Sequence, residues 1–185
     1  TTENSGSYTT GGVTAGSKME QSLREVPRSI SVIGREQLND QRITNLEEAL
    51  EQLPGVTFTR ADGWAAGGIS VRGYALTNIL VDGAPSRGIA EGDTSVNTGM
   101  SKYDNIQLVR GPDGLFSGNG QPSGSLNLVR KRPQESFQLL TTLSAGSWEN
   151  YLGEVDVSSP LTDSGNIRGR LVASYNDTEK FYDDA

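Results

Sequence analysis

Residues 44–55 read TNLEEALEQLPG, and this stretch predicts an amphipathic helix in a chain that is otherwise rich in short strands. Thr44 and Glu47 fit a capping box, with Thr44 as the N-cap residue and Glu47 at the third helical position. The closing Pro-Gly pair predicts the end of the helix. We therefore expect a helix over residues 45–52 that buries one apolar stripe against a sheet. The stripe consists of Leu46, Ala49, Leu50 and Leu53.

Short apolar runs flank this helix and predict strands. Upstream, residues 26–33 alternate apolar and polar side chains, and residues 35–41 fit a helical turn. The strands expected downstream cover residues 56–59, 69–72, 79–81, 106–109 and 125–129. One helix among several short strands indicates a small α+β domain. Residues 1–25 are rich in Thr, Ser and Gly without apolar periodicity, so we expect a flexible N-terminal segment there.

The pattern changes after Pro133. Residues 137–145, 151–158 and 167–175 each alternate apolar and polar side chains. This alternation is typical of transmembrane β-strands, but a soluble antiparallel sheet has the same period, and the strands taken alone favour the soluble sheet. Even the smallest membrane barrels need about eight strands. If these strands belong to a barrel, we expect the chain to be truncated.

Composition excludes several classes of protein. The chain contains no Cys and no His, so disulfides, thiol nucleophiles, histidine bases and the usual zinc sites are ruled out. Its net charge is −7, and this disfavours nucleic acid as a partner because phosphate binding needs clustered Lys and Arg. The one basic run is residues 130–132. No apolar run approaches the length of about 18 residues that a membrane helix needs.

A glycine-rich stretch over residues 110–124 is the strongest candidate for a phosphate-binding loop. It lacks the Lys-Ser/Thr ending of a P-loop and misses the dinucleotide-binding spacing, so successive tight turns explain it better. Carboxylates are numerous, yet none forms a recognisable acid/base pair. Nothing in these residues argues for an enzyme.

Several short motifs, taken in order, carry a resemblance to a known family. They are PRSISVI at 27–33, LPGV at 53–56, ISVRGY at 69–74, LVDGAP at 80–85 and IQLVRGP at 106–112. The chain resembles TonB-dependent outer-membrane receptors, and SGNGQPSGSLNLVRKRP at 117–133 resembles the ferric-siderophore branch in particular. GSYTT at 6–10 is similar to the segment before many such plugs.

The resemblance implies a fold and a domain division. We expect an α+β plug domain with a small mixed sheet over residues 26–134, preceded by the flexible segment 1–25. Residues 135–185 would then be the first antiparallel strands of a truncated transmembrane β-barrel, which in this family has about 22 strands. The resemblance thus reverses the preference for a soluble sheet.

It also implies a function, a location and partners. The expected function is uptake of ferric siderophores with energy from TonB, in the cell outer membrane of a Gram-negative bacterium. The plug would sit inside the barrel with its N-terminus in the periplasm, and outer-membrane lipid would surround the barrel. No TonB box is evident, so either it lies upstream of Thr1, as we expect, or this chain cannot couple to energy. No cofactor is expected, because the iron arrives chelated by the siderophore.

The resemblance also singles out candidate site residues on the plug. Trp64 lies among Ala and Gly neighbours and is a candidate ligand anchor, although it could instead pack on the barrel wall. The ligand-binding candidates are Arg60, Trp64, Ser86, Arg87, Met100 and Ser101. Arg72 and Arg110 each end an apolar strand before a Gly, and the family implies that they lock the plug to barrel glutamates.

Other functions remain open at this point. The same fold could serve as a ligand-sensing or signalling module, and a TonB-dependent receptor could take haem or vitamin B12 in place of a siderophore. A soluble carbohydrate- or nucleotide-handling enzyme that uses the glycine-rich stretch is the alternative from another class. Further alternating strands downstream would favour the receptor, and a catalytic motif downstream would favour the enzyme.

Overall fold

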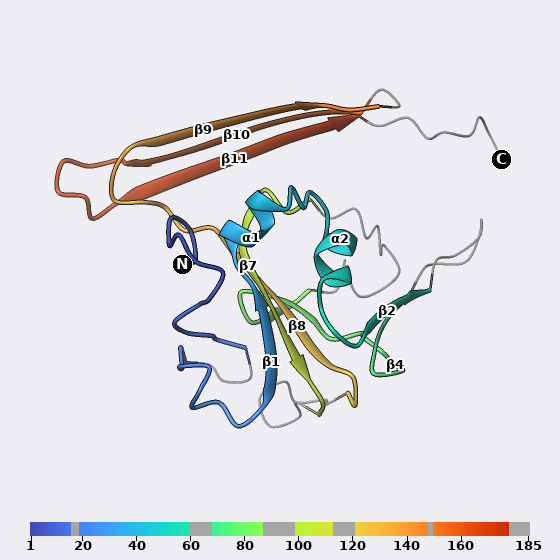
Figure 1. Ribbon diagram of the computed structural model, residues 1–185. Coiled ribbons are helices and arrows are strands. Elements are labelled where there is room, and N and C mark those ends of the chain that lie inside the picture. The colour runs from blue at the N-terminus through green and yellow to red at the C-terminus, as the bar shows by residue number, and fades with distance from the viewer. Residues whose placement is uncertain (16–18, 60–67, 87–98, 113–120, 148–149, 178–185) are drawn as a thin grey trace. The chain divides into compact units, whose positions relative to one another are not determined.

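The computed structural model describes residues 1–15, 19–59, 68–86, 99–112, 121–147 and 150–177 (Figure 1). The chain forms two compact units, Thr1–Arg130 and Lys131–Ala185. The division falls after Arg130, whereas the boundary predicted from the sequence follows Gln134. No helix in the described part of the chain has the length and apolarity needed to cross a membrane.

The first unit is built on a five-stranded sheet in the order β1-β7-β8-β5-β6. β5 pairs with β8 in parallel and the other pairs are antiparallel, so the sheet is mixed, as predicted. The two longest strands, β7 and β8, extend beyond the predicted apolar runs because polar residues at their ends also join the ladder. The strands are β1 (Ser29–Ile33), β5 (Ile79–Val81), β6 (Ala84–Pro85), β7 (Tyr103–Arg110) and β8 (Gly124–Arg130).

Two short helices contribute the apolar core on one side of this sheet. α1 (Arg35–Asp40) and α2 (Leu46–Glu51) confirm the predicted helical segments. The stripe Leu46, Ala49, Leu50 and Leu53 is buried in the core together with strand residues such as Ile106 and Leu128. The order of elements and the buried stripe therefore follow from local periodicity.

The predicted cap of α2 is off by one residue. Asn45, and not Thr44, is the N-cap: its side-chain oxygen accepts a hydrogen bond from the Glu48 amide at 2.9 Å. Glu48 in turn accepts from the Thr44 amide at 2.9 Å. Thr44/Glu47 and Asn45/Glu48 both have capping-box spacing, and Asn is at least as good an N-cap residue as Thr.

A separate three-stranded sheet completes the secondary structure described for the first unit. It has the order β2-β3-β4, with β2 (Val56–Thr59), β3 (Gly68–Val71) and β4 (Tyr74–Ala75). The sequence predicts β2 and β3 but misses the two-residue strands β4 and β6, which are too short to show alternation.

The second face of the five-stranded sheet carries buried polar side chains from β7 and β8, including Asn105, Gln107 and Asn127. The N-terminal segment forms hydrogen bonds with some of these polar side chains. The side-chain oxygen of Gln107 accepts from the amides of Thr14, at 3.2 Å, and Ala15, at 2.8 Å. The segment predicted to be flexible is thus bound to the sheet at this point.

The first residues of the chain are held by Asp104, which is 1% exposed. The Thr2 amide donates to both carboxylate oxygens of Asp104 at 2.9 Å, and the Glu3 amide donates at 3.2 Å. The Thr2 hydroxyl oxygen accepts from the Arg35 amide at 2.9 Å. Thr2 therefore caps α1, whose own N-cap Gly34 has no side chain for the task.

The second unit contains a three-stranded antiparallel sheet in the order β11-β10-β9, drawn in orange to red in Figure 1. β9 (Gln138–Ala145), β10 (Tyr151–Pro160) and β11 (Arg168–Asp177) confirm the three predicted strands. β10 pairs along its whole length with β11.

Candidate functional site

The turn after α2 brings the two predicted lock residues close together. Arg72 follows β3 with a positive φ of 53°, and its amide donates to the Gly55 carbonyl at 2.9 Å. Arg110, at the end of β7, donates from Nε to the Pro54 carbonyl at 3.1 Å and from Nη2 to the Ser31 hydroxyl at 2.8 Å. The backbone of the turn thus binds both arginines.

The charges at this turn have the same sign. Partial burial lowers the pKa of the Arg110 guanidinium, and the nearby charge of Arg72 acts in the same direction. Within the described residues, neither arginine has a carboxylate partner. This arrangement is suited to receive carboxylates from outside the unit, because a guanidinium binds a carboxylate through two parallel hydrogen bonds.

The predicted ligand-binding residues are only partly within the described chain. Arg60, Trp64 and Arg87 lie outside it. Ser86 is half-buried, and its amide donates to the Ile79 carbonyl at 2.9 Å, next to the β5–β6 hairpin.

Met100 and Ser101 are buried, at 0% and 7% exposure. Met100 belongs to the apolar core, and its carbonyl accepts from Arg35 Nη1 at 2.9 Å. In this conformation its side chain is not accessible to a ligand.

The sheet of the second unit has two chemically different faces. One face carries apolar side chains, and the cross-strand pairs Val157–Leu139 and Val157–Leu171 show that they align across the sheet. Several large side chains of this face are exposed: Leu139, Leu143, Tyr151, Val155, Leu171 and Tyr175. The opposite face includes Asp156, Ser158 and Arg170. Exposed apolar and buried polar side chains invert the arrangement of a soluble sheet.

The buried polar set of the second unit was missed by the sequence-based predictions. Asp156 accepts hydrogen bonds from Lys131 and Arg170. Strict alternation along residues 151–158 already placed Asp156 and Ser158 on one face, which was the available signal. That pattern does not show that Lys131, outside the strands, bonds to Asp156.

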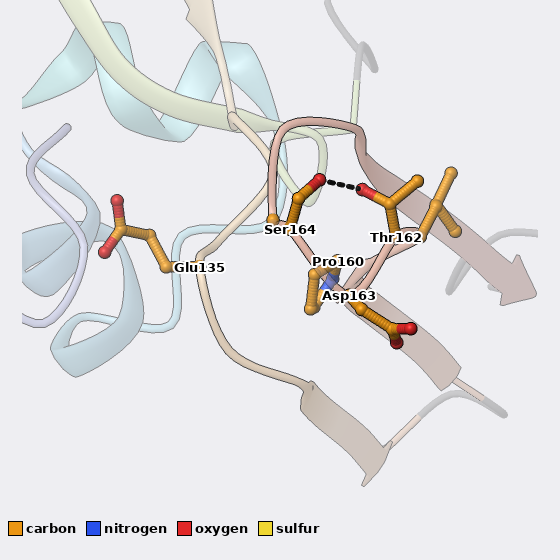
Figure 2. Close-up of a pocket in the computed structure, with 7 residues that line it drawn as sticks. Glu135, Pro160, Thr162, Asp163 and Ser164 are labelled. Carbon is orange, nitrogen blue, oxygen red and sulfur yellow. Dashed lines mark hydrogen bonds between the residues drawn. The ribbon is translucent and has the colours of Figure 1, made fainter.

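The second unit also has an open hollow of about 340 Å³ at the β10–β11 turn, lined by Glu135 and residues 160–165 (Figure 2). The hydroxyls of Thr162 and Ser164 face each other at 3.3 Å, while the carboxylates of Glu135 and Asp163 point in different directions. No cluster of acidic side chains suited to a metal ion occurs among the described residues. The hollow is built differently from the predicted ligand site and includes none of its residues.

Comparison with known proteins identifies the family. The family model named TonB-dependent Receptor Plug Domain matches residues 22–125 of the sequence. The ferric-pyoverdine BN7/BN8 receptor of Pseudomonas putida is 44% identical over 100% of this chain and 22% of that protein. The ferripyoverdine receptor of Pseudomonas aeruginosa is 39% identical over 98% of this chain and 22% of that protein. The chain thus spans about a fifth of the length of these relatives.

Solved structures agree with both units of the fold. The ferripyoverdine receptor of the outer membrane of Pseudomonas aeruginosa, bound to ferripyoverdine, superposes with a TM-score of 0.90 at 37% identity, covering 98% of this chain and 24% of that one. The alcaligin outer-membrane receptor FauA of Bordetella pertussis gives a TM-score of 0.87 at 36% identity, over 96% of this chain and 31% of that one. The chain belongs to the TonB-dependent receptors and contains their plug domain, followed by strands that match the start of the barrel.

Proposed function

We propose that this chain is the plug and the opening barrel strands of an outer-membrane receptor that takes up a pyoverdine-type ferric siderophore with energy from TonB. The observation that carries the proposal is the 44% identity to a ferric-pyoverdine receptor over the whole chain, so that it includes both units. Identity falls to 27% with a metal-pseudopaline receptor and to 30% with the catecholate receptor Fiu of Escherichia coli. This ranking favours pyoverdine as the class of ligand over the catecholates.

The inverted faces of the second unit support a place in the membrane. Side chains such as Leu143, at 81% exposure, and Leu171, at 69%, would cost free energy in water but are suited to lipid. The opposite face, with Asp156 and Arg170, would then face the interior of the barrel. Outer-membrane lipid is therefore part of the proposed surroundings.

The pair Arg72 and Arg110 is proposed as the lock between plug and barrel. Two guanidinium groups beside one turn, without a carboxylate among the described residues, would attract barrel glutamates. The test is a charge swap in the complete receptor. Arg72→Glu or Arg110→Glu should each make the channel leak small solutes, and a matching Glu→Arg change in the barrel should partly restore the seal. An unaltered seal in both single arginine variants would remove these residues from the lock.

Ligand contact is proposed for Arg60, Trp64, Ser86 and Arg87. Met100 and Ser101 belong to the same prediction, but their burial means that a ligand could reach them only if the unit opened. Trp64→Ala in the complete receptor should weaken the binding of ferripyoverdine, measured by fluorescence titration. Unchanged affinity would show that Trp64 packs elsewhere.

The function itself is tested by uptake. The complete receptor, expressed in cells that lack their own pyoverdine receptor, should import radioiron-labelled ferripyoverdine and lose this uptake when TonB is absent. Ferric catecholates and ferric hydroxamates are the comparison ligands, and haem and vitamin B12 test the remaining alternatives. Import of one of these in place of ferripyoverdine would overturn the proposed ligand, and no import of any would overturn the proposed function.

A further inference from the structure

The segment that joins the two units begins with a buried ion network in the second unit. Lys131 Nζ donates to Asp156 Oδ2 at 2.7 Å. Arg170 donates two hydrogen bonds to the same carboxylate, from Nε to Oδ1 at 2.7 Å and from Nη2 to Oδ2 at 2.6 Å. The three side chains are between 6% and 8% exposed. One carboxylate therefore holds two buried cations.

The backbone of the same segment is bound as well. Arg170 Nη1 donates to the Arg132 carbonyl at 2.9 Å, and the Gln134 amide donates to the Ser158 hydroxyl at 2.7 Å. Arg170 lies opposite Ser158 in the register of β10 and β11, and Asp156 precedes Ser158 by one strand period. Asp156, Ser158 and Arg170 thus share one face of the sheet. Together they bind the side chain of Lys131 and the backbone of residues 132 and 134.

The physical character of this network differs from that of a surface ion pair. Burial removes the hydration of each charge, and the loss is offset only while the partners stay in place. Losing one partner removes part of this compensation, so the network disfavours displacement of residues 131–134. The neighbouring pair of Arg168 and Glu135, at 3.1 Å, is exposed and contributes little.

We infer that Asp156 anchors the linker, residues 131–134, to strands β10 and β11, so that the linker is a fixed attachment and not a hinge when the plug rearranges. The inference rests on the proposed transport function for the rearrangement, but the anchoring itself can be measured in the resting receptor. Asp156 acts here as a positioning residue.

Limited proteolysis tests the anchor in the purified complete receptor. Trypsin cleaves after Lys or Arg only when the side chain can enter its specificity pocket, and Lys131 is occupied by Asp156. We expect no cleavage after Lys131 in the wild-type receptor, although three basic residues adjoin there. Asp156→Asn should raise the rate of cleavage after Lys131 by about 100-fold or more, because it removes the charge of the carboxylate that two buried cations share.

Matched variants separate the anchor from a general effect of charge. Asp163→Asn makes the same substitution at an exposed position of the β10–β11 turn and should leave cleavage after Lys131 unchanged. Arg170→Lys keeps the charge but loses the paired hydrogen bonds to Asp156 and the bond to the Arg132 carbonyl. The rate of cleavage after Lys131 in this variant should therefore fall between the rates in wild type and Asp156→Asn. Wild-type resistance in assembled Asp156→Asn receptor would overturn the anchor.

A cross-link tests immobility during transport and leaves the three charged residues intact. Gln134→Cys combined with Ser158→Cys should tie the linker to β10 by a disulfide, in a chain that otherwise contains no cysteine. If the linker is fixed, the oxidised receptor should import radioiron-labelled ferripyoverdine at the rate of the reduced receptor. Uptake that is lost on oxidation and restored by a reducing agent would show that the linker must move.

The two arms also distinguish this inference from the proposed function. A wild-type receptor that imports no ferric siderophore would refute the transport function, while proteolysis would still decide whether Asp156 holds the linker.

Discussion

The two segments that flank the plug sheet are held by different chemistry. The N-terminal segment binds β7 through neutral amides and hydroxyls that donate to Asp104 and Gln107. The linker after β8 is bound through the charges of Lys131, Asp156 and Arg170. A hydrogen bond from a neutral donor can be exchanged for one to water at a net cost of about 0.5–1.5 kcal/mol, or about 1.5–3 kcal/mol when the acceptor is charged. Breaking a buried ion pair costs more.

This difference assigns distinct mechanical roles to the two ends of the plug. The N-terminal segment can be released step by step, because each hydrogen bond is replaced by water as the segment leaves. Release of the linker disrupts three buried charges, whereas release of the N-terminal segment uncovers only the charge of Asp104. If energy reaches the plug from upstream of Thr1, the weakly held end is the end that receives it.

The largest expected effect comes from removing the carboxylate that holds the linker. Asp156→Leu should destabilise the second unit by about 3–5 kcal/mol, because two buried cations lose their common partner. Adding Lys131→Met and Arg170→Met should restore most of the loss, since apolar side chains of similar volume remove the two buried charges. Thermal unfolding of the complete receptor in detergent, followed by circular dichroism, measures both. A triple variant less stable than the single variant would contradict this account.

The next effect concerns Asp104 and the first residues of the chain. Asp104→Ala should cost about 2–3 kcal/mol, because the buried amide of Thr2 loses a charged acceptor. Hydrogen exchange should accelerate at Thr2 and Glu3 but not at Gln134. Asp40→Ala is the control, since Asp40 is exposed and accepts only the exposed hydroxyl of Tyr8 among the bonds described for it. Equal acceleration at both ends of the plug would show that the two attachments are not independent.

A smaller effect is expected at Gln107. Gln107→Met keeps the size of the side chain but removes the acceptor of the Thr14 and Ala15 amides, at a cost of about 1–2 kcal/mol. Hydrogen exchange at Thr14 and Ala15 should then rise. Gln52→Met, at an exposed position after α2, should leave exchange at both amides unchanged.

The smallest effect tests the cap that the N-terminal segment provides to α1. Thr2→Val removes the oxygen that accepts the Arg35 amide and should cost about 1 kcal/mol. Faster exchange at the Arg35 amide would show that the segment stabilises the helix as well as lying on the sheet. The control Thr9→Val alters an exposed threonine whose hydroxyl contacts Ser7.

The helices and strands that were predicted correctly are those with a clear local pattern of apolar and polar residues. The strands at 56–59 and 79–81 match the structure residue for residue. The first is an alternating stretch that follows a Pro-Gly pair, and the second is an apolar run bounded by Asn78 and Asp82. Alternation likewise located β9, β10 and β11. The cap of α2 was wrong by one residue, since two overlapping capping boxes fit the same stretch and spacing alone does not choose between them.

The attachments at the two ends could not be predicted from such patterns. Thr2 and Asp104 are separated by 102 positions, and Lys131 and Asp156 by 25. Their pairing depends on sheet order and strand register, which no local period encodes. The same limit applies to Met100: the sequence places it in a loop, and only the tertiary fold shows that its side chain fills the core.

The three-stranded sheet of the second unit has a consequence for handling this chain outside lipid. Leu143, Leu171 and Tyr175 lie exposed on one face of the sheet. In water, apolar faces of this kind associate with one another, so detergent or lipid should be needed to keep the isolated chain dispersed.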